Sequence, residues 1–113
     1  MKLFKDKTLT EEIIDYFSFG IVPVGEVKQE TLWLKNDSNP KTTGRLIDLE
    51  FEVVCLNPQN DTVIIDERVD ILDSPREMAP YAVEPLKLEW TPRVDLEQGL
   101  KAKLTIKGKK IVG

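Results

Sequence analysis

The sequence predicts an all-β protein built as an antiparallel β-sandwich of about seven strands. Apolar residues recur with a period of two, most clearly between residues 46 and 56. Clusters of Gly, Pro, Asn and Asp interrupt the apolar runs at short intervals, as expected for turns between short strands. The 113 residues, 41% of them hydrophobic, suffice for one domain with its own core.

Composition and charge exclude several classes of protein. No run approaches the roughly 18 apolar residues that a membrane-spanning helix needs. The opening MKLFKDKTLTEE is charged before a signal-peptide core could form, which favours a protein made in the cytoplasm. Cys55 is the single cysteine, so no internal disulfide is possible. A formal net charge of −4 argues against general nucleic-acid binding.

Residues 1–16 are predicted to be an N-terminal arm, and residues 17–113 the sandwich domain. Thr10, followed by two glutamates, favours the N-cap of a short helix through Ile13 and Ile14.

Three apolar residues of the arm, Leu3, Phe4 and Leu9, fall outside the sandwich pattern. Two interpretations are open: the segment covers an edge of its own sheet, or it docks on a neighbouring subunit. We predict the docking arm, because so short a segment cannot offset its ordering entropy alone.

The first two strands are expected between Phe17 and Asn36, separated by a Gly- and Pro-containing link. Within the second, Leu32 and Leu34 share one face, which places Trp33 on the other. An outward Trp33 is either covered by a neighbouring loop or available as an interface anchor.

Residues 46–56 show the clearest alternation in the chain. One face carries apolar side chains and the other carboxylates; the apolar set is Ile47, Leu49, Phe51, Val53 and Cys55, and the acidic row is Asp48, Glu50 and Glu52. Nothing nearby completes a coordination set, so no metal site is expected.

Residues 62–72 are expected to return beside residues 46–56 as a hairpin, with Arg68 closest to the acidic row. Glu67 falls in the apolar parity of this segment, which suggests a bulge or a break near it.

Two further strands are expected at residues 83–90 and 100–107, where Pro85 places the first at an edge or at its own start. In the second, Lys101, Lys103 and Lys107 point outward. The predicted core comprises Ile47, Leu49, Phe51, Val53, Leu86, Leu88, Leu104 and Ile106.

The order and spacing of several short motifs resemble immunoglobulin-like sandwich domains of the abnormal-spindle, hydin and major sperm protein type. The first half supplies Phe19-Gly20, Val22, Val24-Gly25, Leu32, Leu34 and Asn36; the second supplies Ala79-Pro80, Trp90-Thr91-Pro92, Gly99, Ala102, Leu104, Ile106 and Gly108. The resemblance covers residues 17 to 112 and implies an immunoglobulin-like fold without implying a reaction.

Nothing in the sequence indicates catalysis. Histidine, the commonest general base and metal ligand, is missing, and there is no phosphate-binding glycine loop. We therefore expect no enzyme activity, no cofactor and no small-molecule substrate. A free-standing domain resembling this family is expected to be a structural protein, most readily a phage virion component such as a capsid decoration protein. The alternative is a cytosolic or cytoskeletal adaptor that binds a protein or peptide through an exposed sheet edge.

Charge is unevenly distributed along the chain. Residues 44–89 contain 11 acidic and 4 basic residues, whereas residues 90–113 contain 2 acidic and 6 basic ones. These charges are either solvated strand faces or complementary surfaces that contact a partner or another copy. The candidate interface residues are Leu3, Phe4, Leu9, Trp33, Asp48, Glu50, Glu52, Lys101, Lys103 and Lys107, with the lysines of one copy expected to meet the acidic row of the next.

Overall fold

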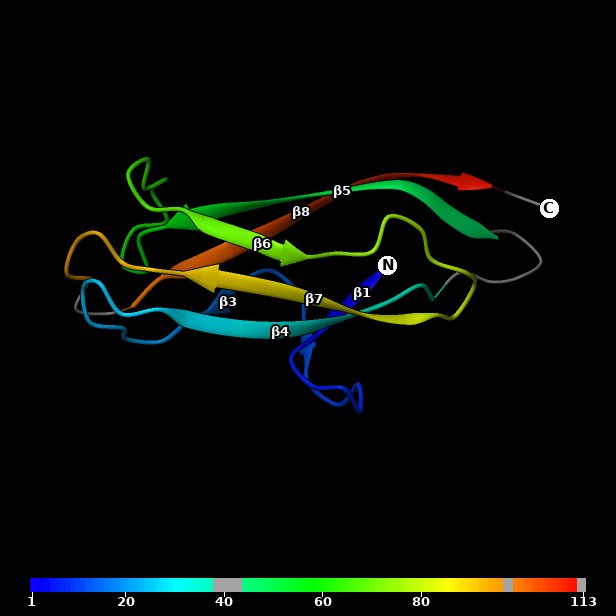
Figure 1. Cartoon of the computed structure of the whole chain (residues 1–113), viewed down its shortest axis with the longest axis horizontal. Helices are drawn as coiled ribbons and strands as arrows, with labels where there is room; N and C mark the ends of the chain where they lie inside the picture. The colour runs from blue at the N-terminus through cyan, green and yellow to red at the C-terminus, as the bar shows by residue number, and fades with distance from the viewer. Residues whose placement is uncertain (38–43, 97–98, 112–113) are drawn as a thin grey trace.

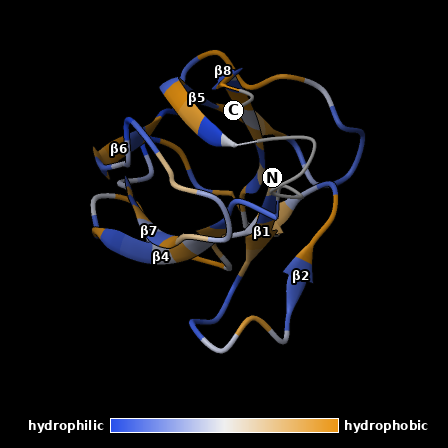
Figure 2. Cartoon of the chain, turned by 90° about the vertical axis from the view of Figure 1, so that its right-hand side faces the viewer, coloured by the Kyte–Doolittle hydropathy of each residue, from blue (hydrophilic) through white to orange (hydrophobic). Residues whose placement is uncertain are grey.

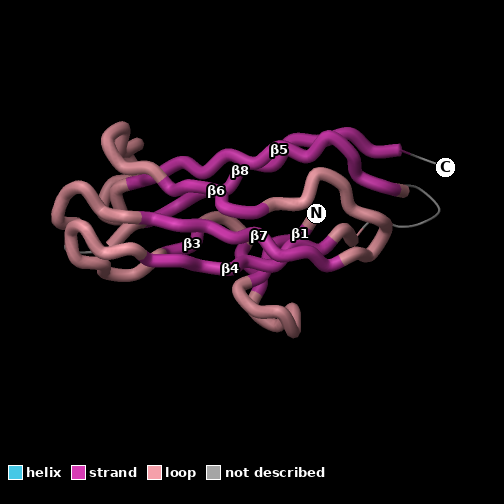
Figure 3. The backbone as a smooth tube through the Cα atoms, in the orientation of Figure 1, coloured by secondary structure: helices cyan, strands magenta, loops and turns pink. Residues whose placement is uncertain are grey.

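Eight β-strands make up the fold. The computed structural model describes residues 1–37, 44–96 and 99–111, and within these ranges it contains strands and loops but no helix (Figure 3). In chain order the strands are β1 (Lys2–Phe4), β2 (Glu12–Ile13), β3 (Phe17–Ser18), β4 (Lys28–Lys35), β5 (Arg45–Leu56), β6 (Val69–Asp73), β7 (Val83–Trp90) and β8 (Lys101–Ile111).

The strands form two sheets that pack against each other (Figure 1). The larger sheet has the order β2-β1-β4-β7-β6, and the smaller has the order β3-β8-β5. Every pairing between these strands is antiparallel. β5 and β8 run side by side along the long axis of a molecule that measures 49 × 26 × 24 Å. The prediction of an all-β sandwich is confirmed.

The core lies between the sheets, and its centre follows the predicted alternation. Leu32 and Leu34 are buried on β4, and Leu86, Leu88 and Trp90 are buried on β7. Among the predicted core residues, Leu49, Leu86 and Leu88 are buried, whereas Phe51, Val53, Leu104 and Ile106 are only half-buried and pack against the core from its side. The half-buried set lies on β5 and β8.

A β-bulge in β5 reverses part of the predicted alternation. The register with β8 shifts between Ile47 and Glu50, and Asp48 has a φ of 52°. Aspartate tolerates this left-handed conformation better than most residues do. Because the bulge inserts one residue, Leu46 instead of Ile47 points inward before it, with 6% of its surface exposed. The placement of Ile47 in the core is therefore wrong.

The segment after β5 crosses to the other sheet. Val63 forms a single bridge with Leu56 at the end of β5, after which β6 pairs with β7 in the larger sheet. The predicted hairpin between residues 62–72 and β5 is therefore wrong, and Arg68 does not lie beside the acidic row of Asp48, Glu50 and Glu52. Its Nε lies 2.7 Å from Oδ1 of Asp70 instead.

The buried carboxylate of Glu67 holds this crossing in place. Glu67 is 4% exposed and accepts hydrogen bonds from Nε1 of Trp90 at 2.8 Å and from the backbone N–H groups of Arg93 at 2.8 Å and Val94 at 3.0 Å. A buried carboxylate is tolerated when such donors satisfy it. The bonds connect the start of β6 to the end of β7 and the loop that follows.

The N-terminal segment belongs to the larger sheet. β1 pairs with β4, placing Leu3 opposite Leu34, and β2 pairs with β1. Leu3, Phe4 and Ile13 are buried, with 9%, 8% and 8% of their surfaces exposed. Ladder hydrogen bonds and apolar burial together offset the ordering entropy that residues 1–16 could not meet alone. The prediction of an intermolecular arm is therefore wrong, and the edge-covering interpretation holds.

A turn takes the place of the helix predicted after Thr10. The carboxylate of Asp6 accepts hydrogen bonds from the hydroxyls of Thr10 and Thr8 and from the backbone N–H groups of Thr10 and Glu11. These bonds, the Thr10 hydroxyl first among them, lower the pKa of Asp6. Leu9 adopts a left-handed φ of 60°, so the chain reverses and returns as β2. The connection projects from the body of the sandwich (Figures 1 and 2).

The first testable consequence concerns this N-terminal segment. Phe4→Ala should lower the free energy of unfolding by about 3–5 kcal/mol, because it removes a buried aromatic side chain. Ile14→Ala is the matched control, since Ile14 is 84% exposed and its truncation should change stability by less than about 0.5 kcal/mol. Chemical denaturation measures both; similar small effects would show that residues 1–16 do not belong to the folded sheet.

A second consequence concerns Glu67. Glu67→Gln replaces one acceptor oxygen with an NH₂ group that meets a donor, so unfolding should become easier by about 2–3 kcal/mol. Arg68→Gln changes the neighbouring residue, whose side chain is 81% exposed, and should be nearly neutral. Equal midpoints for the two variants in urea denaturation would contradict the stabilising role assigned to the hydrogen bonds of Glu67.

Candidate protein-binding edges

The apolar residues predicted to form an interface are engaged within the chain. Leu3 lies on the core side of β1, opposite Leu34, whereas Phe4 is buried on the other face, opposite Trp33. Leu9 is half-buried in the β1–β2 turn. Trp33 is half-buried on the opposite face of β4, with Nζ of Lys7 5.6 Å from its ring centroid. The same turn therefore covers Trp33, in agreement with the loop-cover interpretation.

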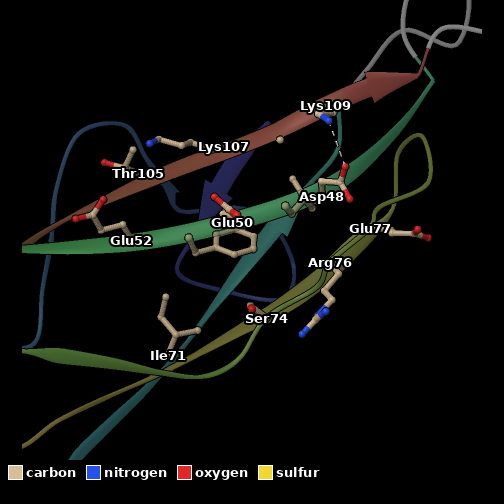
Figure 4. Close-up of a pocket in the computed structure, with 13 residues that line it drawn as sticks. Asp48, Glu50, Glu52, Ile71, Ser74, Arg76, Glu77, Thr105, Lys107 and Lys109 are labelled. Carbon is tan, nitrogen blue, oxygen red and sulfur yellow. Dashed lines mark ion pairs between the residues drawn. The ribbon is translucent and has the colours of Figure 1, made fainter.

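The acidic and basic rows face each other within one molecule. Glu50 lies directly opposite Lys107 in the β5–β8 pairing, and Oδ2 of Asp48 lies 3.7 Å from Nζ of Lys109 (Figure 4). Glu52 lies opposite Thr105. The acidic row thus already lies beside basic residues of its own sheet, and its contact with the lysines of another copy stays a prediction.

The two remaining lysines of the predicted interface differ in their surroundings. Nζ of Lys101 lies 2.6 Å from Oδ1 of Asp61 and 3.9 Å from the ring centroid of Tyr16, so its charge is already engaged. Lys103 is exposed and lies opposite Val54, which offers it no charge.

An open groove separates β5 from the segment that follows β6. It has a volume of about 1240 Å³, and its walls include Phe51, Ile71 and Arg76 (Figure 4). Four carboxylates line it, Asp48, Glu50, Glu52 and Glu77, together with the basic side chains of Arg76, Lys107 and Lys109. This mixture of charges gives the groove no dominant sign.

Backbone contacts close both ends of the β5 edge that faces this groove. At one end Leu46 and Met78 exchange hydrogen bonds of 2.9 Å, and the Leu49 N–H donates to the Arg76 carbonyl at 3.0 Å. At the other end the Ile64 N–H donates to the Cys55 carbonyl at 2.8 Å. The open stretch of this edge is thereby limited to residues 50–54.

The opposite edge of the small sheet is open over a longer stretch. β3 covers only the first two residues of β8, with Phe17 opposite Ala102 and Ser18 opposite Lys101. Among the described residues, no strand pairs with β8 on this side beyond Ala102. β8 continues to Ile111, so most of its length has a neighbour on one side only.

Hydrogen-bond direction identifies the unpaired groups. The Leu100 carbonyl accepts from the Phe19 N–H at 3.2 Å, so the backbone groups of Leu100 point toward β3. The backbone groups of successive residues in a strand alternate between its two neighbours. Those of Leu104 and Ile106 therefore also point to the β3 side, whereas those of Lys103 and Thr105 point to β5. The N–H and C=O groups of Leu104 and Ile106 therefore point out of the sheet edge.

The second groove lies along this open edge. It has a volume of about 290 Å³ and is lined by Leu104 and Ile106 on β8 and, across from them, by the N-terminal segment, including Leu3, Ile13 and Phe17. Burial along β8 decreases as the neighbouring strand ends. Ala102 is 0% exposed beside β3, whereas Leu104 and Ile106 are only partly buried beside the groove. Apolar side chains thus accompany unpaired backbone groups at one site.

Cys55 and the acidic side chains are the remaining candidates for nucleophilic or metal chemistry. Cys55 is 3% exposed, and burial raises the pKa of its thiol, as expected for a core cysteine. Within residues 1–37, 44–96 and 99–111, no three Cys, Asp or Glu side chains are grouped so as to hold a metal ion. The same ranges contain no helix of the length and hydropathy needed to cross a membrane.

Comparison with protein families, with curated proteins and with solved structures gives no match. The resemblance to the abnormal-spindle, hydin and major sperm protein domains therefore stays a prediction from the motifs.

The open edge predicts an alternating pattern of amide hydrogen exchange along β8. The amides of Leu104 and Ile106 should exchange roughly a hundredfold or more faster than those of Lys103 and Thr105, which donate to β5. Residue-resolved exchange measured by NMR tests this directly. Equal protection of the four amides would mean that another segment occupies the edge in solution.

Proposed function

We propose that this chain is a non-enzymatic binding protein that takes up an extended strand of a partner along the open edge of β8. One observation carries the proposal: unpaired backbone groups and partly buried apolar side chains that border the groove coincide at Leu104 and Ile106. Strand addition at a sheet edge uses both features, because main-chain hydrogen bonds supply affinity and alternate side chains fill pockets.

The energetic argument favours a strand over other ligands. A partner strand would satisfy the N–H and C=O groups of Leu104 and Ile106 and would cover the apolar surface of both side chains. A small molecule confined to the groove of about 290 Å³ could do this only in part, because it cannot continue the backbone ladder along the strand edge.

The two partner classes weighed from the sequence would use the same surface. A virion subunit would offer a terminal arm or loop strand, and a protein bound by a cytosolic adaptor would offer an extended peptide segment. We propose the virion component first, on the family resemblance, and the adaptor second; the partner's identity alone separates them. Both proposals describe a protein without enzyme activity.

A peptide selection followed by mapping tests the proposed function. Twelve-residue peptides selected for binding should protect the amides of Leu104 and Ile106 from hydrogen exchange, because these become ladder donors to the added strand. Protection confined to the groove between β5 and β6, or failure of every peptide in a diverse library to bind, would overturn the proposal.

Two proline variants supply matched controls. Ile106→Pro removes an N–H that faces the open edge, so folding should be retained at a cost of about 1–2 kcal/mol while peptide binding is lost. Thr105→Pro removes an N–H that bonds to β5 and should destabilise the fold by at least about 1–3 kcal/mol more. If Ile106→Pro fails to fold, the mapping of protected amides on the unmodified chain still decides the matter.

A further inference from the structure

The outward side chains of β8 carry information about the strand that the edge would accept. Lys103, Thr105 and Lys107 point away from the core, and both lysines are exposed. The inward side chains beside them are Leu104 and Ile106. A partner strand therefore meets positive charge on one face and apolar surface on the other.

We propose that the edge of β8 selects an antiparallel strand with the pattern acidic–apolar–polar–apolar–acidic. The two acidic residues would face Lys107 and Lys103, and the two apolar residues would face Ile106 and Leu104. This inference rests on the proposed function, because it specifies the partner for the same edge.

The antiparallel direction follows from the strand already present. β3 pairs with β8 in antiparallel orientation and ends the neighbouring track at Ala102. A strand that continues this track keeps the same direction and the same hydrogen-bonding register. It would place its hydrogen-bonded positions opposite Leu104 and Ile106.

The same register brings charged side chains into close contact. Lys103 and Lys107 direct their backbone groups to β5, so the positions facing them on the open side are non-hydrogen-bonded pairs. In such pairs the two Cα atoms lie about 4.5 Å apart and the side chains approach most closely. Lys103 has Val54 as its β5 neighbour, so an acidic residue on the open side would be its first direct cross-strand charge partner.

The far wall of the groove restricts the inward positions to uncharged side chains. Glu12 and Asp15 line that wall together with Ile13 and Ile14, and Lys2 is the basic side chain on the same wall. An inward carboxylate would lose hydration against the apolar side chains of β8, and Glu12 and Asp15 would already compete with it for Lys2. Acidic residues are thus favoured on the outward face alone.

A second copy of the same edge is disfavoured by the same charges. Antiparallel pairing of two β8 edges would set lysines of one copy against lysines of the other, since Lys103, Lys107, Lys109 and Lys110 are all exposed. Like charges directly opposite each other destabilise a cross-strand pair. The lysines thus exclude self-pairing and favour an acidic partner at once.

Test strands fused to the chain would measure this preference. Each fusion carries a flexible Gly-Ser linker after Gly113 and a test strand, which raises the effective concentration of the strand at the edge. The strand Glu-Val-Thr-Val-Glu should raise the melting temperature and protect the amides of Leu104 and Ile106. The composition-matched strand Val-Glu-Thr-Glu-Val, with the opposite parity, and the strand Lys-Val-Thr-Val-Lys should do neither.

Charge reversal provides the reciprocal test with free peptides. In the double variant Lys103→Glu/Lys107→Glu, binding of the acidic strand should weaken by roughly tenfold, and the lysine strand should bind instead. The charge-matched control Lys5→Glu/Lys87→Glu alters two exposed lysines away from β8, one just after β1 and one on β7, and should leave the preference for the acidic strand unchanged. Fluorescence anisotropy at low salt reports the affinities.

The outcomes separate the two levels of the proposal. If neutral, acidic and basic strands with inward valines protect Leu104 and Ile106 equally, the charge rule is wrong and strand uptake stands. If none protects these amides, strand uptake itself is wrong. Concentration-dependent dimers in sedimentation, with the same amides protected without any added strand, would identify a second copy as the occupant and overturn the acidic partner.

Discussion

A five-stranded sheet packs against a three-stranded one, and within the described part of the chain this difference leaves part of β8 without a neighbouring strand on one side. β8 is the middle strand of the smaller sheet, yet β3 accompanies it for only two residues. The chain leaves β2 in the larger sheet and enters β3 in the smaller one within a few residues, so residues 14–16 span the sheets and add no further pairing to β8. Leu104 and Ile106 remain only partly buried for this reason, although their parity is that of core residues.

The other crossing between the sheets is secured by polar contacts. Glu67 lies where the chain passes from β5 to β6, and its carboxylate satisfies the indole N–H of Trp90, itself 1% exposed, and two backbone N–H groups beyond β7. Each of these donors would be costly to bury unpaired. One side chain thus links the start of β6 to the end of β7 and the loop that follows. Because β6 pairs in the larger sheet, the edge of β5 has no partner strand between the backbone contacts at its two ends among the described residues.

Local patterns in the sequence predicted burial within strands well and pairing between strands poorly. The alternation around Leu32, Leu86 and Leu88 identified the core faces, because burial has the period of the strand itself. The bulge at Asp48 escaped prediction, since an uninterrupted polar–apolar alternation gives no sign of an inserted residue. Glu67 was noticed as a misfit, and its apolar parity was the signal of a buried carboxylate, but its donors lie 23 to 27 residues further along the chain. The lysines of β8 were correctly expected to point outward, whereas the open edge beside them depends on where the N-terminal segment pairs.

Sheet edges in this protein are protected by different means, and the comparison isolates β8. β2 is a two-residue strand, β6 carries Asp70 and Asp73 along its short length, and β5 is stapled to its own chain at both ends. Short strands, charges and covering loops all discourage unwanted pairing. Within the described residues, β8 alone combines a long unpaired edge with inward apolar side chains. Its lysines leave the backbone groups of that edge accessible, and their positive charge would favour an acidic partner strand. Charged side chains on both faces of β8 would discourage pairing with any strand. Charge on one face alone leaves the edge open to a strand of complementary pattern.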